Sequence, residues 1–373
     1  MAALLRAAVP FIQVDPNTKA LHVTDDARRA LSGISTGVSV CAVAGVYRTG
    51  KSYILNQLAE HERAFGTGST VQACTKGIWM FLVTLQTGTT LVLLDTEGLQ
   101  SIDQTEGHDA NIFCLALLLS SFFVYNSEKA INSGALDQLS LVAQLTTRIR
   151  VHAQQGDDSA GGGGGGGRLQ DFFPRFVWLL RDFQLKLQDA HGEQVTPDQY
   201  LEECLQPQPG ASAAVAEQNV TRGAVRELFE RRSCIALPHP TLGTELPESA
   251  LKELPPLAQL AEGFQEGVTE LKRRVHAARA KVVNGTALTG VMLLSLAESY
   301  VKAISEGAVP TISTAWASVL RIESGKAIKL AVTQYREGAN AVVMATPTPS
   351  RADWLAHHER LVTRAGPVLN ARS

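Results

Sequence analysis

One loop constrains the fold of this chain more than any other segment. Residues 45–52 read Gly-Val-Tyr-Arg-Thr-Gly-Lys-Ser and match the pattern G-x-x-x-x-G-K-S. An apolar, β-branched run precedes the loop at 38–44, and residues 52–60 carry apolar side chains at helical spacing. A strand, a glycine-rich loop and a helix in this order are typical of the phosphate-binding loop of an α/β nucleotide-binding domain.

Each residue type in the loop has a physical reason to be there. Glycines allow backbone N–H groups to turn toward the β-phosphate, and the N-terminus of the following helix adds its dipole. Lys51 is expected to bring a positive charge to the β- and γ-phosphates, and Ser52 to offer its hydroxyl to Mg²⁺. The sequence therefore predicts that the chain binds a nucleoside triphosphate with magnesium.

A second apolar run, residues 91–94, ends in Asp95-Thr96-Glu97-Gly98. A carboxylate at a strand end can reach Mg²⁺ through its water shell, and a glycine three residues later can approach the γ-phosphate with its backbone N–H. Thr75 lies between the two motifs and is expected to act as a switch that closes on Mg²⁺ and the γ-phosphate. Without its neighbours, the segment around Thr75 would be an ordinary loop.

A third apolar run, residues 176–180, leads into Arg181-Asp182. A carboxylate here can accept hydrogen bonds from N1–H and the exocyclic amine of guanine, whereas adenine has no N1–H donor. The residues alone are equally compatible with a salt-bridged turn. The base motif N-K-x-D of small GTPases is missing, and Leu99 stands where those proteins carry a water-positioning glutamine.

Arg48 lies inside the phosphate loop and is the candidate for promoting hydrolysis in place of that glutamine. A guanidinium at this position can neutralise the charge that develops on the γ-phosphate in the transition state. The alternative is that Arg48 pairs with a surface carboxylate and has no catalytic role.

Composition excludes several other classes of protein. The net charge of −2 argues against a nucleic-acid partner attracted by bulk charge. Five cysteines without a C-x-x-C pair fit a reduced, cytoplasmic chain. The apolar stretch 112–125 is too short for an integral membrane segment and is read as a buried helix that leads into a strand. The two ends of the chain match neither a secretory signal nor a prenylation box.

The 373 residues suit two domains. Alternating strand and helix patterns predict an α/β domain with a mostly parallel sheet and flanking helices over 1–281. From about residue 257 the periodicity is helical without further strands, and a short all-α domain is expected over 286–373. Residues 206–220 are read as a loop, and the glycine-rich insertion at 154–167 as a flexible one. The expected strands are 38–44, 78–85, 90–94, 122–126, 176–180 and 233–237.

The spaced motifs together resemble the guanylate-binding proteins, which belong to the dynamin-related superfamily of large GTPases and are related to the atlastins. The resemblance rests on 45–52, on Thr-Lys-Gly-Ile-Trp at 75–79, on Leu-Asp-Thr-Glu-Gly-Leu at 94–99 and on Leu-Arg-Asp-Phe at 180–183. Residues 124–127 and 237–240 also fit the family, and residues 299–316 are similar to the start of its helical middle domain.

The resemblance implies a P-loop GTPase domain followed by a truncated helical middle domain. It implies Mg²⁺-dependent binding and hydrolysis of GTP, with homodimerisation through the GTPase domain when nucleotide binds and with Arg48 acting as an arginine finger in cis. By matched position, the catalytic residues are Arg48, Lys51, Thr75 and Glu97. The metal ligands are Ser52, Thr75 and Asp95. The nucleotide-binding residues are Gly45, Tyr47, Arg48, Thr49, Gly50, Lys51, Ser52, Tyr53, Gly98, Arg181 and Asp182.

One departure from the family bears on activity. Relatives usually carry serine and then histidine before the switch threonine, whereas this chain carries Ala73 and Cys74. The serine helps to hold the attacking water in the family. An alternative function is therefore a GTP-gated assembly protein with weak or no hydrolysis, and a further one is an atlastin-like membrane-fusing GTPase.

Overall fold

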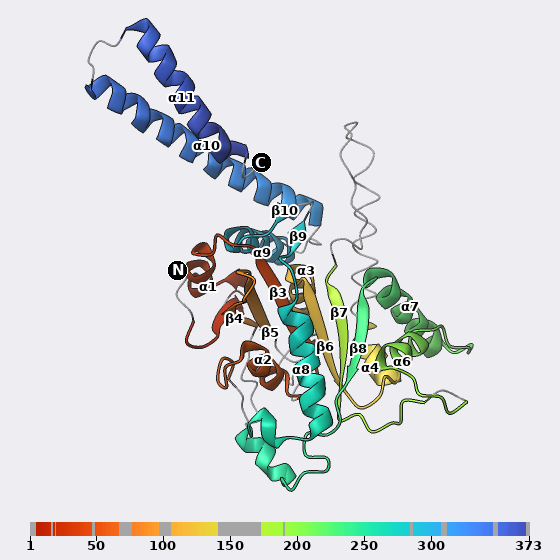
Figure 1. The fold of residues 1–373 in the computed structure, drawn as a ribbon. Coiled ribbons are helices and arrows are strands. Elements are labelled where there is room, and N and C mark those ends of the chain that lie inside the picture. The colour runs from red at the N-terminus through yellow and green to blue at the C-terminus, as the bar shows by residue number, and fades with distance from the viewer. Residues whose placement is uncertain are drawn as a thin grey trace. The chain divides into compact units, whose positions relative to one another are not determined.

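The computed structural model divides into two compact units, residues 1–311 and residues 312–373, which are described separately (Figure 1). The structure describes residues 5–15, 18, 20–46, 49–66, 77–96, 106–140, 173–188, 191–283, 286–306, 312–345 and 350–370. The glycine-rich insertion expected at 154–167 lies outside these residues.

The first unit is built on a sheet of eight strands in the order β2-β1-β4-β5-β3-β6-β7-β8. The five neighbours from β5 to β8 run parallel, and β4, β1 and β2 continue the sheet with antiparallel pairs. The strands are β1 (Val9–Val14), β2 (Leu21–Val23), β3 (Val38–Gly45), β4 (Ile78–Thr84), β5 (Thr90–Thr96), β6 (Phe122–Glu128), β7 (Arg175–Arg181) and β8 (Arg232–Ala236).

This sheet confirms the predicted fold class and the six strands expected from the sequence. Two strands, β1 and β2, were not expected. The reason is local, because β1 contains Pro10, a residue that usually argues against a strand, and its pairing with β4 is irregular between Pro10 and Ile12. β2 has only three residues and carries little periodic signal.

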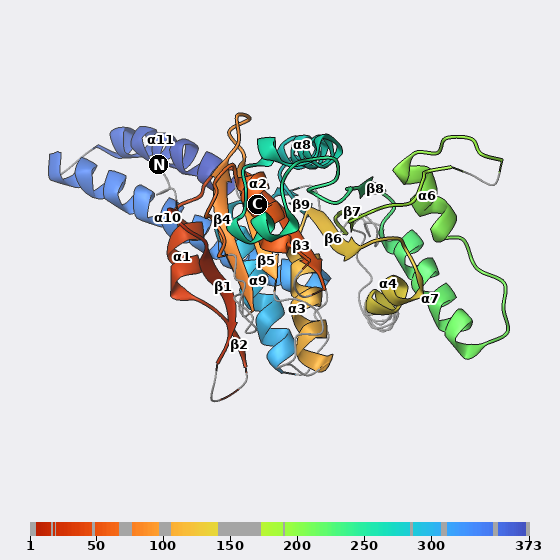
Figure 2. The same cartoon turned by 90° about the horizontal axis from the view of Figure 1, so that it is seen from below.

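Helices cover both faces of the sheet. Figure 2 shows α8 on one side of the strands and α3 and α9 on the other. The buried apolar residues of α2 and α8 join those of the strands in one continuous core. The helices of this unit are α1 (Asp25–Ser32), α2 (Lys51–Ala59), α3 (Glu106–Leu119), α4 (Ser133–Gln138), α6 (Pro197–Cys204), α7 (Ala213–Leu228), α8 (Glu262–His276) and α9 (Gly290–Ser305), with 3₁₀ turns at Glu248–Glu253 and Leu257–Gln259.

Two expectations about the second half of the chain are corrected. Helix α7 begins at Ala213, inside the stretch expected to be a loop, because Ser212 caps it by accepting from the backbone N–H of Val215. A two-stranded hairpin, β9 (Val282–Val283) with β10 (Thr286–Ala287), follows α8 where no strand was expected. Each of these strands is too short to show an alternating pattern.

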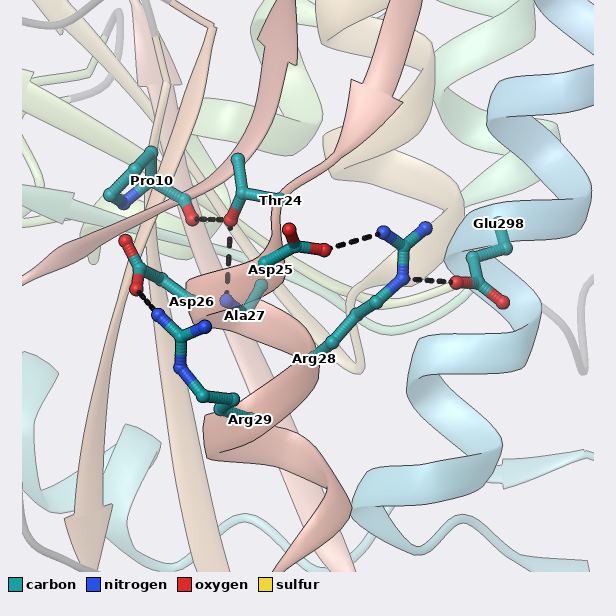
Figure 3. A network of polar contacts seen from close by, with 8 residues as sticks. All are labelled: Pro10, Thr24, Asp25, Asp26, Ala27, Arg28, Arg29 and Glu298. Atoms are coloured by element: carbon teal, nitrogen blue, oxygen red, sulfur yellow. Dashed lines mark hydrogen bonds and ion pairs between the residues drawn. The ribbon is translucent and has the colours of Figure 1, made fainter.

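Helix α1 is held at its start by a hydrogen-bonded cap (Figure 3). The hydroxyl of Thr24 accepts from the backbone N–H of Ala27 at 3.2 Å and donates to the carbonyl oxygen of Pro10 in β1 at 2.5 Å. On the same helix, Arg28 pairs with Glu298 of α9 at 2.8 Å. The cap ties α1 to strand β1, and the ion pair joins it to α9, a helix of the same unit.

The second unit consists of α10 (Ile312–Ala345) and α11 (Arg351–Asn370), which pack against each other. The hydroxyl of Tyr335 and Nδ1 of His358 lie 2.8 Å apart and join the two helices. The helical domain expected from the sequence is thus present, while the boundary at 281–286 stays a prediction. None of the helices that the structure describes is long and apolar enough to cross a membrane.

Lys281 is a buried cation between α8 and β9. Its side chain is only 6% exposed, and its ammonium group donates to the backbone carbonyl of Ser120. Burial lowers the pKa of Lys281 from 10.5 to about 7. The folded chain therefore carries an expensive charge below neutral pH.

This burial predicts a pH-dependent difference between the wild-type chain and Lys281→Met. Because the pKa of Lys281 is lower in the folded chain, the unfolded chain binds more protons between about pH 7 and pH 10.5. The free energy of unfolding of the wild-type chain should therefore rise by roughly 2 kcal/mol relative to Lys281→Met from pH 7 to pH 9. Urea unfolding at both pH values measures this change, and a difference independent of pH would contradict it.

Candidate functional site

The loop that follows β3 requires glycine at its first position. Gly45 has φ of +151°, and a Cβ added to it would lie 1.9 Å from the backbone oxygen of Asn126 on the neighbouring strand β6. Gly50 has φ of +77° and forms the N-cap of α2. The tight approach and the left-handed turn explain why a glycine stands at each end of this segment.

Lys51 begins α2 and lies buried against the loop. Its ammonium group donates to the backbone oxygen of Val46 at 2.9 Å, an oxygen to which Thr49 Oγ1 also donates at 2.8 Å. Burial lowers the pKa of Lys51, while the nearby Asp95 partly opposes this effect. The helix N-terminus and this lysine together give the loop a positive potential that suits phosphate oxygens.

Ser52 and Asp95 meet beside Lys51. The Ser52 hydroxyl donates to Oδ2 of Asp95 at 2.6 Å. Asp95 lies near the carboxyl end of β5 and is paired in register with Val43 of β3, the strand that the loop follows. Asp95 and the loop therefore lie at the same end of these parallel strands. A hydroxyl and a carboxylate are the hard oxygen ligands that Mg²⁺ takes when it keeps several waters and phosphate oxygens. The residues present therefore fit the magnesium ion expected from the sequence.

Arg181 joins the end of β7 to the phosphate loop. Its Nη1 donates to the backbone oxygen of Thr49 at 3.2 Å, and its Cζ lies 5.2 Å from the centroid of the Phe264 ring. Burial lowers the pKa of Arg181, and the negative charge of Asp182 is the largest opposing influence. The Arg181 side chain thus lies against the phosphate loop, while base recognition by Arg181-Asp182 stays a prediction beside the alternative of a salt-bridged turn.

A cavity of about 270 Å³ opens next to this contact. Asp182 lies on its wall in a left-handed conformation with φ of +54°, which is uncommon for a residue with a side chain. Hydrogen bonds from Lys129 N to Arg181 O and from Phe183 N to Leu237 O hold the turn on both sides of Asp182. The remaining lining comes mainly from the loop, α2 and the segment that precedes α8: Thr49, Gly50, Tyr53, Glu128, Arg181, His239, Pro240, Leu251, Leu254, Pro255, Leu260 and Phe264.

Three buried polar atoms around the loop and the cavity have no hydrogen-bond partner among the residues that the structure describes. They are the Tyr53 hydroxyl, Arg181 Nε and Asn126 Oδ1. Burial also raises the pKa of Tyr53 to about 12. Buried groups of this kind are costly unless something bonds them, so a polar ligand or ordered water is expected to complete the site.

Asn126 lies in the segment 124–127 that fits the family pattern, but the sequence predicted no role for it. It lies near the carboxyl end of β6, opposite Gly45, and is fully buried. Its Nδ2 donates to the Thr49 backbone oxygen at 2.9 Å and to Thr49 Oγ1 at 2.6 Å. Asn126 therefore fixes Thr49 of the loop to strand β6. A polar residue at the carboxyl end of a buried parallel strand was the available signal.

We expect Asn126→Ala to weaken nucleotide binding by about tenfold and to cost about 1–3 kcal/mol of stability, because Thr49 loses both bonds in a buried place. Asn219→Ala is a matched control, since Asn219 also bonds a backbone, that of Gln208, but at the surface. Nucleotide titration and urea unfolding of the two variants measure the effects. Equal losses in both variants would contradict a role for Asn126 in the loop.

The structure brings together all nine of the predicted site residues that it describes. Gly45, Thr49, Gly50, Lys51, Ser52, Asp95, Arg181 and Asp182 cluster at the carboxyl ends of β3, β5 and β7, and Tyr53 joins them from α2. Five predicted residues lie outside the described part of the chain: Tyr47, Arg48, Thr75, Glu97 and Gly98. Their roles stay predictions.

The central parallel sheet, the glycine loop at the end of β3 and the helix that starts with Lys51 define an α/β protein of the P-loop class. Two family models match the chain. The guanylate-binding protein N-terminal domain matches residues 18–284, and the guanylate-binding protein C-terminal domain matches residues 284–373. The chain belongs to the guanylate-binding protein family.

Individual relatives agree with this assignment. Guanylate-binding protein 2 of Rattus norvegicus is 39% identical over 98% of this chain and 61% of its own length. Guanylate-binding protein 2 of Homo sapiens is 37% identical over 96% of this chain and 60% of its own length. Guanylate-binding protein 1 of Mus musculus is 38% identical over 96% of the chain and 60% of its own length. The chain thus spans about three fifths of the relatives that it matches.

Proposed function

We propose that this chain binds GTP with Mg²⁺ and hydrolyses it. The observation that carries the proposal is the bond from Arg181 to Thr49, which joins the segment proposed to recognise the base to the phosphate loop, beside a cavity lined by Asp182. Guanine in this cavity would offer N1–H and its amine to the Asp182 carboxylate, while the phosphates would extend along the loop toward Lys51. Family membership supports the same assignment.

The Mg²⁺ ion would be held by Ser52, with Asp95 acting directly or through water, and Thr75 is the proposed switch ligand. When bound, the ion neutralises charge on the β- and γ-phosphates. The chain's own residues supply the rest. Lys51 binds phosphate oxygens, backbone N–H groups of the loop orient them, and Arg48 neutralises the charge that develops during transfer to water. Glu97 is proposed to belong, with Asp95, to the water network around the metal ion.

We further propose that GTP drives homodimerisation through the α/β unit and that the protein acts in the cytoplasm. The partner's contact would turn Arg48 into its own active site, as the resemblance implies. Cys41, Cys204 and Cys234 are free thiols, which supports a reducing compartment. The alternative, a GTP-gated assembly protein with weak hydrolysis, rests on Ala73 and Cys74.

Steady-state phosphate release tests the enzymatic proposal. Purified chain should release phosphate from GTP faster than from ATP, and EDTA should stop the release. Elution volume with GDP and with a GTP transition-state mimic tests dimerisation in the same preparation. Tight binding of GTP without release would support the assembly protein instead, and the absence of GTP binding would overturn both functions.

A further inference from the structure

A second cavity lies at the opposite end of the sheet from the phosphate loop. Its volume is about 450 Å³, in the range of small-molecule sites. Its wall includes Ser121 just before β6, Arg175 at the start of β7, Arg231 just before β8 and the segment from Ala277 to Val282. The phosphate loop follows the carboxyl end of β3, whereas this cavity faces the starts of its parallel neighbours, so the two sites are distinct.

The lining of this cavity is strongly cationic. Three arginines, Arg175, Arg231 and Arg279, and the buried Lys281 contribute to it, against one carboxylate from Glu230. Among the residues that the structure describes, no side-chain hydrogen bond or ion pair involves any of the three guanidinium groups. Some other arginines of the same unit are paired, such as Arg28 with Glu298 at 2.8 Å and Arg232 with Glu202 at 2.6 Å.

Lys281 adds a buried basic group to the wall of the cavity. It is 6% exposed and donates to the backbone oxygen of Ser120, which leaves further N–H donors of the ammonium group. Burial lowers its pKa to about 7. Arg175, Arg231 and Arg279 are exposed, so their unpaired guanidinium groups are solvated and available to an anion. A bound anion would also stabilise the charged form of the buried Lys281.

We propose that this cavity binds a small molecule that carries two or more phosphate groups. Guanidinium groups form paired hydrogen bonds to phosphate oxygens, and several cations around one hollow favour a compact polyanion over a single charge. The volume exceeds what one phosphate needs and suits a small polyphosphate. The proposal does not depend on the nucleotide site, because no residue of the cavity belongs to the phosphate loop.

Calorimetric titration with tripolyphosphate tests the site. The titration is done on the full chain carrying Lys51→Ala, so that the phosphate loop contributes little. Adding Arg231→Ala or Arg279→Ala should weaken binding by about tenfold each, because each removes a charge-assisted pair. Arg226→Ala is the matched control, since Arg226 is an exposed arginine at the end of α7 that does not line the cavity, and it should change binding by less than about twofold.

Three results would overturn the proposal: no tripolyphosphate binding by a folded chain, equal loss in the Arg226→Ala and Arg231→Ala chains, or tighter binding of hexaglutamate than of tripolyphosphate. Circular dichroism of each variant shows whether it is folded. A failure of GTP binding elsewhere in the chain would leave these outcomes unchanged.

Proton uptake provides a second readout. At pH 8 Lys281 should be mostly neutral, and an anion beside it favours the charged form, so binding should take up protons. Arg175, Glu230, Arg231 and Arg279 are the other charged groups that line the cavity. The number of protons taken up is obtained by measuring the binding enthalpy in buffers of different ionisation enthalpy and taking the slope. It should be smaller in Lys281→Met than in the chain that retains Lys281, and equal uptake in both chains would overturn the assignment.

Discussion

Replacing Arg48 by alanine is expected to slow steady-state release of phosphate from GTP by about a thousandfold, with GTP affinity changed by only a few fold. The guanidinium is proposed to act on charge that appears in the transition state, so its loss should lower kcat and kcat/KM together. Phosphate release at saturating GTP, combined with a separate binding titration, distinguishes this from a loss of affinity.

Arg63→Ala is the matched control for this experiment, because Arg63 is an exposed arginine after α2 and outside the phosphate loop. It should leave the rate unchanged. A fall in kcat of less than about fivefold in Arg48→Ala would contradict the arginine finger. If the wild-type chain itself releases no more phosphate than Arg48→Ala, the GTP-gated assembly protein becomes the better description.

Asp182→Asn should lower the affinity for GTP by about a hundredfold. The change turns one carboxylate oxygen into an NH₂ donor that faces the N1–H and amine donors of guanine, and a mismatched buried hydrogen bond costs about 1–3 kcal/mol. Xanthosine triphosphate carries a carbonyl in place of that amine. The variant should therefore bind this nucleotide better than the wild-type chain does.

Competition titrations with GTP, ATP and xanthosine triphosphate measure the relative affinities of the wild-type and Asp182→Asn chains for the three nucleotides. Asp25→Asn serves as the control, because the Asp25 side chain is 82% exposed on α1 and does not line the cavity. An unchanged preference for GTP over ATP in Asp182→Asn would show that another group selects the base. In that case Glu128, the other carboxylate on the cavity wall, would be the next candidate.

The parts of the fold that the sequence predicted are those with long, regular patterns. The buried parallel strands are continuous apolar runs, and α8 shows its core face as Phe264, Val268, Leu271 and Val275. The parts that it missed are short or interrupted, such as β1 with Pro10 and the hairpin of β9 and β10. Such segments become strands because the sheet and the neighbouring chain supply their hydrogen bonds, and no local signal records that.

The sequence by itself determined the class of site, because phosphate binding needs glycine, lysine and serine at fixed spacing within one loop. It also supplied Asp95 and Arg181-Asp182 at strand ends. Only the tertiary structure decided how these pieces meet. The register of parallel strands places Asn126 opposite Gly45, the burial of Arg181 turns it toward Thr49, and the segment before α8 closes the cavity beside Asp182. These contacts join residues far apart along the chain, so spacing alone does not encode them.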